Sequence, residues 1–379
     1  MNALRPARVT DDPVLSILAP NALECLTRLR GDLRLGLPVI LTGDGAACFV
    51  VPVETLSSER HTALLSEGAI GEVVLTRHRA AMLGLHGLPD AEVLSIALPA
   101  QAGIDWLLRL ADPALSGVQA AAMPQLRISA GKTIHRAAIA LAKSAQLLPA
   151  TLVVPVEDAV NAAMRHGLSI MDANLILSEL TRARVQYPVA SARLPMTVHE
   201  AGQVHVYRPD DGGIEHYAIE IGSPDRSRPV LVRLHSACFT GDVLGSLKCD
   251  CGPQLNAATA AMAAAEGGIL LYLNQEGRGI GLANKMRAYA LQDQGLDTVE
   301  ANHHLGFDDD ERDFRIGSAL LARLGIASVR LLTNNPAKVA MLQAQGITVS
   351  ERVPLRVGQT AQNAHYLSTK AAKSGHLLK

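Results

Sequence analysis

Gly268-Ile-Leu-Leu-Tyr-Leu273 and the turn Gln275-Glu-Gly-Arg-Gly-Ile-Gly281 that follows it decide the fold of the second half of the chain. The short, unbroken apolar run predicts a strand that is buried on both faces of a sheet. Helices are predicted on either side of it, over 253–266, with Pro253 at the start, and over 282–294. A helix, a buried strand and a second helix in this order predict an α/β domain with some parallel pairing.

The same alternation continues through the rest of this half. The further predicted elements are strands over 230–234 and 327–332 and helices over 314–324 and 336–345. Asn335 is the expected cap of the last helix, because Pro336 suits the first helical position. The half therefore has a regular strand–helix pattern.

The first half mixes strands and helices less regularly. Its predicted elements are strands over 37–42, 48–52 and 72–76, with a turn at Gly43-Asp44-Gly45, and helices over 134–148 and 170–183. Ser169 is the expected cap of the last helix, with Asp172 in its first turn. We expect an α/β (α+β) chain of two domains, 1–188 and 189–379, divided near Pro188.

Composition excludes several classes of protein. The 379 residues include 35 Lys plus Arg and 36 Asp plus Glu, so a net charge of −1 argues against a nucleic-acid binder. No apolar run approaches the length of a membrane helix. Residues 1–13 lack the apolar core of a signal peptide. Five cysteines in such a chain favour the cytoplasm over a disulfide framework.

Three of these cysteines fall in one short window with the spacing C-x10-C-x-C: Cys238, Cys249 and Cys251. Thiolates are soft ligands that suit zinc, and three protein ligands leave one tetrahedral position for water, as in catalytic zinc sites. Two alternatives remain open, which are a closed structural site with His235 as fourth ligand and three unconnected thiols.

Two strand-to-helix junctions have features of phosphate-binding sites. The glycines of 275–281 let backbone N–H groups approach a phosphate, and Thr333 and Lys338 flank the second junction. The alternatives are an ordinary turn and an ordinary capped helix. An acidic run, 308–313, precedes a predicted helix, and its alternative role is capping, with Asp310 as the cap.

Together these residues resemble the GTP cyclohydrolase II family, which opens the purine ring of GTP at the start of riboflavin synthesis. The resemblance covers about half the chain, from near Leu194 onward. Its segments, in the order of the family, are 233–238, 240–242, 246–252, 275–282, 287–293, 297–302, 310–314 and 332–336.

The resemblance implies a role for each matching residue. Zinc would be held by Cys238, Cys249 and Cys251. The GTP site would be lined by Arg233, Leu234, His235, Ser236, Ala237, Gln254, Glu276, Gly277, Arg278, Thr298, Thr333 and Lys338. Asp310 would be the proton acceptor, and Tyr289 would lie near the purine. The family scheme makes Arg312 a nucleophile toward the α-phosphate, and because a guanidinium is always charged, Arg312 could equally stabilise charge there.

The implied reaction is zinc-dependent hydrolysis of GTP to 2,5-diamino-6-ribosylamino-4(3H)-pyrimidinone 5′-phosphate, formate and pyrophosphate. Mg²⁺ would accompany the triphosphate, and the resemblance also implies a homodimer. The alternatives are a paralogue that serves another pathway or retains the triphosphate, and a nucleotide-binding regulatory protein without turnover.

The chain departs from the family pattern at Ala237, where Glu is usual, and at Asn274, where Arg or His is usual. In many bacteria the family is fused to a 3,4-dihydroxy-2-butanone-4-phosphate synthase domain, which has an acidic metal loop after its first strand. The corresponding stretch here, 43–49, lacks nearly all of those acids. We therefore expect residues 1–188 to be a degenerate or unrelated domain without that chemistry.

Overall fold

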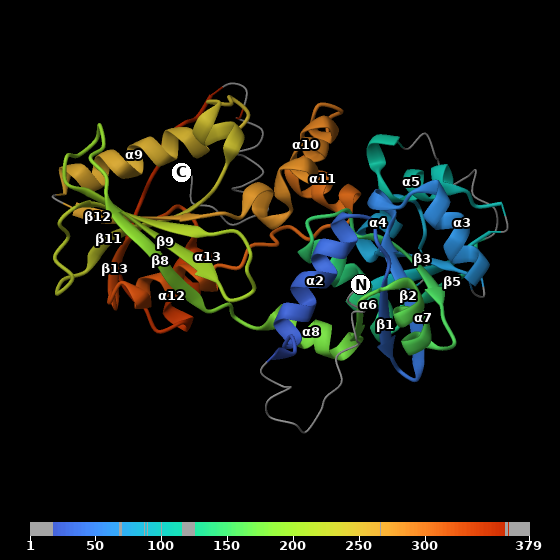
Figure 1. Ribbon diagram of the computed structural model, residues 1–379. Helices are drawn as coiled ribbons and strands as arrows, with labels where there is room; N and C mark the ends of the chain where they lie inside the picture. Colours follow the sequence, from blue (N-terminus) through green and yellow to red (C-terminus); the bar gives the residue numbers. More distant parts are fainter. Residues whose placement is uncertain are drawn as a thin grey trace. The chain divides into compact units, whose positions relative to one another are not determined.

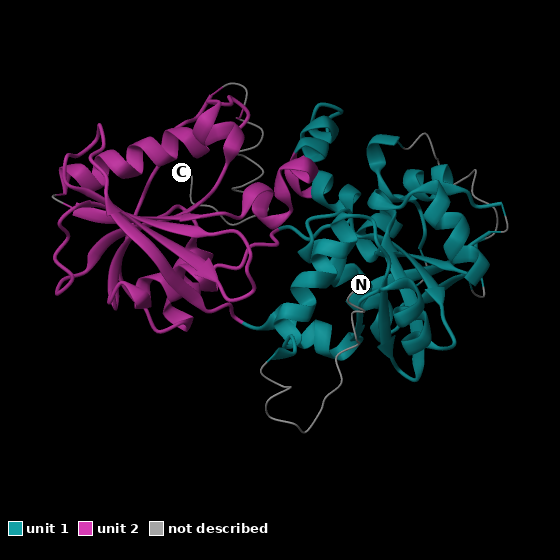
Figure 2. Cartoon of the chain, viewed as in Figure 1, with its two compact units in different colours: residues 1–182, 286–296, 300–309 teal, residues 183–285, 297–299, 310–379 magenta. Residues whose placement is uncertain are grey.

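The computed structural model describes residues 18–67, 70–86, 88, 90–99, 101–115, 126–265, 267–360 and 363. Residues 1–13, which the sequence analysis considered as a signal segment, lie outside this set. The chain forms two compact units, coloured separately in Figure 2: residues 1–182, 286–296 and 300–309, and residues 183–285, 297–299 and 310–379. The position 188/189 lies inside strand β8 (Gln186–Arg193), which pairs within the second unit.

A seven-stranded sheet of order β5-β4-β3-β6-β2-β1-β7 forms the centre of the first unit. Its strands are β1 (Val39–Gly43), β2 (Ala46–Pro52), β3 (Glu72–Thr76), β4 (Val93–Ala97), β5 (Ile128–Ala130), β6 (Ala150–Pro155) and β7 (Ile170–Asp172). The predicted turn is confirmed, because β1 and β2 pair antiparallel across Asp44 and Gly45, which both have positive φ. The predicted strand over 72–76 is also confirmed.

Helices pack against the sheet and form the core of the first unit together with it. They are α2 (Ala22–Arg34), α3 (Ser58–Glu67), α4 (Arg77–Met82), α5 (Ile104–Ala111), α6 (Thr133–Ser144), α7 (Ala159–His166) and α8 (Ala173–Thr181). The prediction for 170–183 was wrong at its start, because 170–172 pair with β1 as a strand. Asp172, not Ser169, caps α8, since its side chain accepts from the backbone N–H groups of Asn174 and Leu175. Ser169 donates instead to Asp32, at 2.6 Å.

The second unit contains another seven-stranded sheet, of order β14-β13-β11-β12-β10-β9-β8. Besides β8, its strands are β9 (Gly202–Pro209), β10 (His216–Gly222), β11 (Val230–Ser236), β12 (Gly267–Leu273), β13 (Ser328–Leu332) and β14 (Thr348–Val353). Strand β11 pairs in parallel with both β12 and β13, and β14 continues this arrangement, whereas β8 to β10 are antiparallel. The predicted α/β fold with some parallel pairing is confirmed.

Helices cover both faces of this sheet (Figure 1). The helix α9 (Cys251–Ala264) lies on one face, with Met262 packed against Leu231 and Leu270. On the other face lie α12 (Arg315–Arg323) and α13 (Pro336–Ala344). Successive strand residues point to opposite faces, so β12 is buried on both, as its apolar run predicted.

Two helices run from one unit into the other along the chain. They are α10 (Gly281–Gln292) and α11 (Thr298–Leu305). The sequence analysis predicted the first and missed the second. Within the described residues, no helix combines the length and the apolar character needed to cross a membrane.

Parallel pairing brings the carboxyl ends of β11, β12 and β13 to one edge of the sheet. The segments that leave this edge are 237–243, 274–280 and 333–335. These segments contain the candidate residues Ala237, Cys238, Glu276, Gly277, Arg278 and Thr333. Ligands of open α/β sheets bind at such an edge, so the fold itself indicates where the site lies.

We expect Gly317→Ala to destabilise the second unit by about 1–3 kcal/mol, because a Cβ there would lie 2.6 Å from Cδ2 of Leu234 in the core. The control is Gly31→Ala in α2, where a Cβ meets nothing within 4 Å. It should stabilise the first unit by roughly 0.5–1 kcal/mol, since glycine is costly inside a helix. Calorimetric melting measures both shifts, and equal effects would contradict this packing.

Candidate functional site

Three cysteine thiols gather where β11 ends and α9 begins. The sulfur atoms of Cys238, Cys249 and Cys251 all lie within 4.8 Å of one another, and the first two are 3.7 Å apart. Two sulfurs that each lie about 2.3 Å from a tetrahedral zinc are about 3.8 Å apart, so the observed separation suits that ion. Cys238 and Cys249 are both buried. The structure therefore confirms a candidate metal site formed by these three residues.

Gly241 keeps the space beside the sulfurs free. It lies in the π-helical turn η4 (Phe239–Val243), and a Cβ on it would lie 2.8 Å from Sγ of Cys249 and 3.1 Å from Sγ of Cys238. Its carbonyl also approaches Gly252, where a Cβ would lie 2.2 Å from that oxygen. Glycine at both positions lets the two cysteine segments close around one point. The thiol set and this geometry fit a zinc ion.

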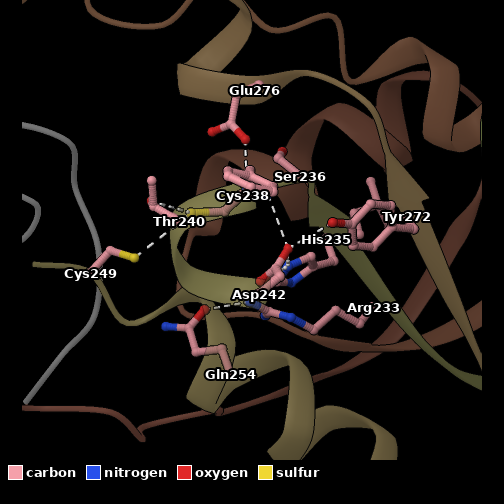
Figure 3. A network of polar contacts seen from close by, with 12 residues as sticks. Arg233, His235, Ser236, Cys238, Thr240, Asp242, Cys249, Gln254, Tyr272 and Glu276 are labelled. Atoms are coloured by element: carbon pink, nitrogen blue, oxygen red, sulfur yellow. Dashed lines mark hydrogen bonds and ion pairs between the residues drawn. The ribbon is translucent and has the colours of Figure 1, made fainter. Parts of the chain in front are cut away.

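His235 does not belong to the metal site. Its Nε2 lies 3.0 Å from both carboxylate oxygens of Asp242, and both side chains are buried. Asp242 also accepts from the Tyr272 hydroxyl at 2.9 Å and from the backbone N–H of Cys238 at 3.0 Å (Figure 3). Burial lowers the pKa of His235, although Asp242 opposes this shift. Among the described residues, the cluster of possible metal ligands holds the three cysteines and not His235, whose Nε2 is held by Asp242, so the alternative of His235 as a fourth ligand is wrong.

Lys285 brings a cation to the thiols. Its ammonium donates to Sγ of Cys238 at 3.1 Å, to Oγ1 of Thr240 at 2.9 Å and to Oε1 of Glu276 at 2.8 Å. Hydrogen bonds from the neighbouring cysteines Cys249 and Cys251, and then Lys285, lower the pKa of the Cys238 thiol, so it is the thiolate form that this environment favours. The sequence analysis missed Lys285.

The loop after β12 is fixed in a strained conformation. Gly277 and Arg278 both have φ of about 63°, in the left-handed region that is uncommon for a residue such as arginine. The Glu276 carboxylate accepts from the backbone N–H of Phe239 at 2.6 Å and of Gly277 at 3.0 Å. The alternative of an ordinary turn does not describe this loop, because its acid ties it to η4 and to Lys285.

Arg233 is a buried cation on the same face of the sheet as His235. Its guanidinium donates to the Leu332 carbonyl at 3.0 Å and to Oε1 of Gln254, and Gln254 in turn donates to Asp250 at 2.5 Å. Burial lowers the pKa of Arg233 to about 10, so it stays charged at neutral pH. Its Nε has no hydrogen-bond partner among the described residues, which leaves one buried donor free.

Asp310 and Arg312 form a two-pronged ion pair. Nε and one terminal nitrogen of Arg312 lie 2.7 and 2.5 Å from the two oxygens of Asp310. Burial raises the pKa of Asp310, but the hydrogen bonds from Arg312 outweigh it and the net pKa is lowered. The capping alternative is wrong, because α12 starts at Arg315 with Phe314 as its cap residue. The Asp310 carboxylate instead accepts from the backbone N–H of Arg312, ahead of the helix.

Gln275 holds the segment that carries this pair. Its side-chain amide accepts from the Asp313 N–H at 2.6 Å and donates to the Asp313 carbonyl at 3.1 Å. The carbonyl of Arg278 accepts from the Glu311 N–H at 3.0 Å. Sequence reasoning missed this clamp, for which the only local signal was a glutamine directly after a buried strand.

The junction between β13 and α13 forms a capped helix. Asn335 is the N-cap of α13, with Pro336 in its first turn, as predicted. Lys338 turns back to the sheet, donates to the Leu234 carbonyl at 3.0 Å and lies 5.0 Å from the ring centre of Phe314. Ser236, at the end of β11, accepts from Arg312 at 3.2 Å. Lys338 and Arg312 thus lie beside the last residues of β11.

The remaining candidates are less tightly connected to this edge. The Ala237 N–H donates to the Leu273 carbonyl, which extends the sheet past β11. Asn274 points its amide toward the Glu215 carbonyl at the start of β10. Thr298 belongs to the short segment 297–299 of the second unit, and Tyr289 lies in the part of α10 that belongs to the first unit.

Comparisons with known proteins match up to 94% of the chain. A family model described as GTP cyclohydrolase II matches residues 187–354. A protein of Azospirillum brasilense named GTP cyclohydrolase-2 is 42% identical over 371 residues, which is 94% of either chain. One of the same name from Neisseria meningitidis is 55% identical over 190 residues, which is 50% of this chain and 95% of the relative.

A solved structure of a two-domain 3,4-dihydroxy-2-butanone 4-phosphate synthase from A. baumannii also matches, and the match covers 81% of this chain and 93% of that protein's chain. The sequence identity is 15% and the TM-score is 0.35. A match at this level assigns no activity to the first unit.

We expect Gly241→Ala to weaken metal binding while the protein stays folded, because the new methyl group would occupy the space beside two sulfurs. Metal content after dialysis against a weak chelator measures the loss, and melting measures the fold. Gly31→Ala is the matched control and should retain its metal. Full metal retention by Gly241→Ala would contradict the geometry described here.

Proposed function

The chain belongs to the GTP cyclohydrolase II family, and from this we propose that it hydrolyses GTP with zinc to 2,5-diamino-6-ribosylamino-4(3H)-pyrimidinone 5′-phosphate, formate and pyrophosphate. Its activity is that of GTP cyclohydrolase II, a hydrolase that acts on the C–N bonds of a cyclic amidine. The reaction would supply the first step of riboflavin synthesis.

The three-thiol cluster is the observation that carries the zinc part of the proposal. Cys238, Cys249 and Cys251 offer three soft ligands, and no other His, Cys, Asp or Glu joins their cluster among the described residues. Zinc held in this way lowers the pKa of water and so supplies a nucleophile near neutral pH. An open coordination position is the feature that separates catalytic from structural zinc sites.

The cations at the same edge would bind the triphosphate. Arg233 offers a buried N–H donor that lacks a partner, and Lys338 lies at the end of β11. Arg278 sits in the glycine-rich loop after β12, held with positive φ. Basic groups offset the phosphate charge in phosphoryl transfer, and we propose that Mg²⁺ shares that role here. The nucleotide site would include the other GTP-site residues that the resemblance implies.

Asp310 and Arg312 would work as a pair that separates when substrate binds. In the structure, both oxygens of Asp310 are occupied by Arg312, and a carboxylate with a lowered pKa is a weak proton acceptor. If Arg312 moves to the α-phosphate, where it stabilises charge, the carboxylate loses its partner and its pKa rises. Asp310 would then accept a proton more readily, and Tyr289 would contact the purine.

Other parts of the proposal concern the whole protein. We propose a cytoplasmic homodimer that binds no nucleic acid and no membrane. The first unit would be a degenerate or unrelated domain without 3,4-dihydroxy-2-butanone-4-phosphate synthase activity, because the loop after β1 lacks a dense set of acids. Its seven-stranded sheet and its own hydrophobic core support the proposal of a separate domain.

Incubation of the zinc-loaded protein with GTP, followed by mass spectrometry, tests this function. The pyrimidinone monophosphate with formate and pyrophosphate supports it. A ring-opened product that retains the triphosphate would show the paralogue reaction. GTP binding without any product would show a regulatory protein instead.

We expect Cys249→Ser to lose the metal and ring opening together, because a hydroxyl replaces one of three thiolate ligands. Metal analysis and formate release measure the two effects. Cys48→Ser is the matched control, since Cys48 is a buried cysteine of the first unit's core that lies outside the cluster. Equal metal content and activity in Cys249→Ser and wild type would disprove the assignment.

We expect Asp310→Asn to lose roughly 100-fold or more in turnover, which is the contribution of a general base. It should melt within about 1 kcal/mol of wild type, because Asp310 does not cap α12 and part of the carboxylate is solvent-exposed. Arg312→Lys keeps the charge but loses the two-pronged geometry, so it should slow pyrophosphate release without loss of zinc. Near-normal turnover of Asp310→Asn would return this pair to a structural role.

A further inference from the structure

We propose that Lys285 is a positioning residue that joins the thiolate centre to the loop after β12. The proposal rests on the zinc site proposed above, and it gives a role to a side chain outside the set of candidate residues. Lys285 lies in the first turns of α10, directly after the glycine-rich loop, and it is buried. A buried lysine is costly unless its charge is paired and hydrogen-bonded.

The ammonium of Lys285 has acceptors on two different segments. Cys238 Sγ and Thr240 Oγ1 belong to the end of β11 and to η4, and Glu276 Oε1 belongs to the loop after β12. The other oxygen of Glu276 accepts from the Phe239 N–H, next to Cys238 in the chain. A single cation therefore closes a small ring of contacts between the metal ligand and the loop.

Charge explains why a cation is needed at this point. Cys238 must be a thiolate to bind a metal, and the carboxylate of Glu276 contacts the same ammonium. Their side chains are largely excluded from water, so repulsion between the two would be poorly screened. Lys285 turns this repulsion into two attractive contacts, and without a cation at this position the thiolate and the carboxylate would repel each other.

Two consequences follow for the site. Loss of the cation should disturb Cys238 as a ligand, and changes of this kind around a metal site commonly cost about 10–100-fold in metal affinity. Loss of the carboxylate should have the opposite electrostatic effect, because the ammonium then interacts mainly with the thiolate. These opposite signs distinguish a charge bridge from simple packing.

The experiment compares wild type, Lys285→Met, Lys285→Arg, Glu276→Gln and the double variant Lys285→Met/Glu276→Gln. Zinc affinity is measured by competition with a chromogenic chelator, and the sulfur-to-cobalt charge-transfer band is recorded after loading with Co²⁺. Arg330→Met, which removes an exposed cation from the same unit, is the control. Circular dichroism and melting confirm that each variant is folded.

We expect Lys285→Met to bind zinc roughly 10-fold or more weakly and to move the charge-transfer band to longer wavelength, since the thiolate loses a positive neighbour. Lys285→Arg should stay close to wild type. Glu276→Gln should move the band to shorter wavelength, and the double variant should regain part of the lost affinity. Arg330→Met should change neither quantity.

The outcomes separate this proposal from the proposed function. If wild type binds neither zinc nor Co²⁺, the metal site itself is wrong. If wild type binds both metals but Lys285→Met leaves affinity and band unchanged, only the role of Lys285 is wrong. If Lys285→Met fails to fold, the sulfur-to-cobalt charge-transfer band of Glu276→Gln is the deciding measurement. A band at the wild-type wavelength in that variant overturns the charge bridge. A double variant as weak as Lys285→Met would also overturn it.

Discussion

The parallel pairing of β11 with both β12 and β13 is the constraint on which the site depends. It sends three strands toward one edge and places residues from distant parts of the sequence there, such as Arg233, Glu276 and Lys338. The pairing is stabilised by burial on both faces, with α9 on one side and α12 and α13 on the other. A shift of β11 by one residue would turn Arg233 and His235 to the opposite face and separate them from Gln254 and Asp242.

Local sequence patterns were sufficient for β11, β12 and β13, for the helices α9, α10, α12 and α13 and for the cysteine cluster, but not for the antiparallel strands β8 to β10. The strand over 268–273 follows from its apolar run, and the capped start of α13 follows from Asn335 and Pro336. The partners of charged side chains could not be predicted in this way. His235 was a possible metal ligand by spacing alone, but its nitrogen is held by an aspartate that only the turn of η4 brings close.

The division into units shows the same limit at a larger scale. Residues 286–296 and 300–309 belong to the first unit, although the sequence motifs at 287–293 and 297–302 resemble the family of the second half. Composition and periodicity report on neighbours along the chain, whereas unit membership depends on contacts at long sequence separation. The Arg287 contacts with Glu54 and Asp112, deep in the first half of the sequence, are of this kind.

The ion pairs Lys285–Glu276 and Arg312–Asp310 differ in how readily they can be broken. Lys285 has three acceptors on two segments, and its contact with Glu276 is largely shielded from water, so breaking it would leave a buried charge without its partner. Asp310 is more exposed than Glu276, and water can therefore solvate it when Arg312 leaves. An incoming triphosphate would compete for cations that already have partners, and it would take the one whose partner is least costly to release. We therefore propose that Arg312 passes to the substrate and that Lys285 stays with the metal centre.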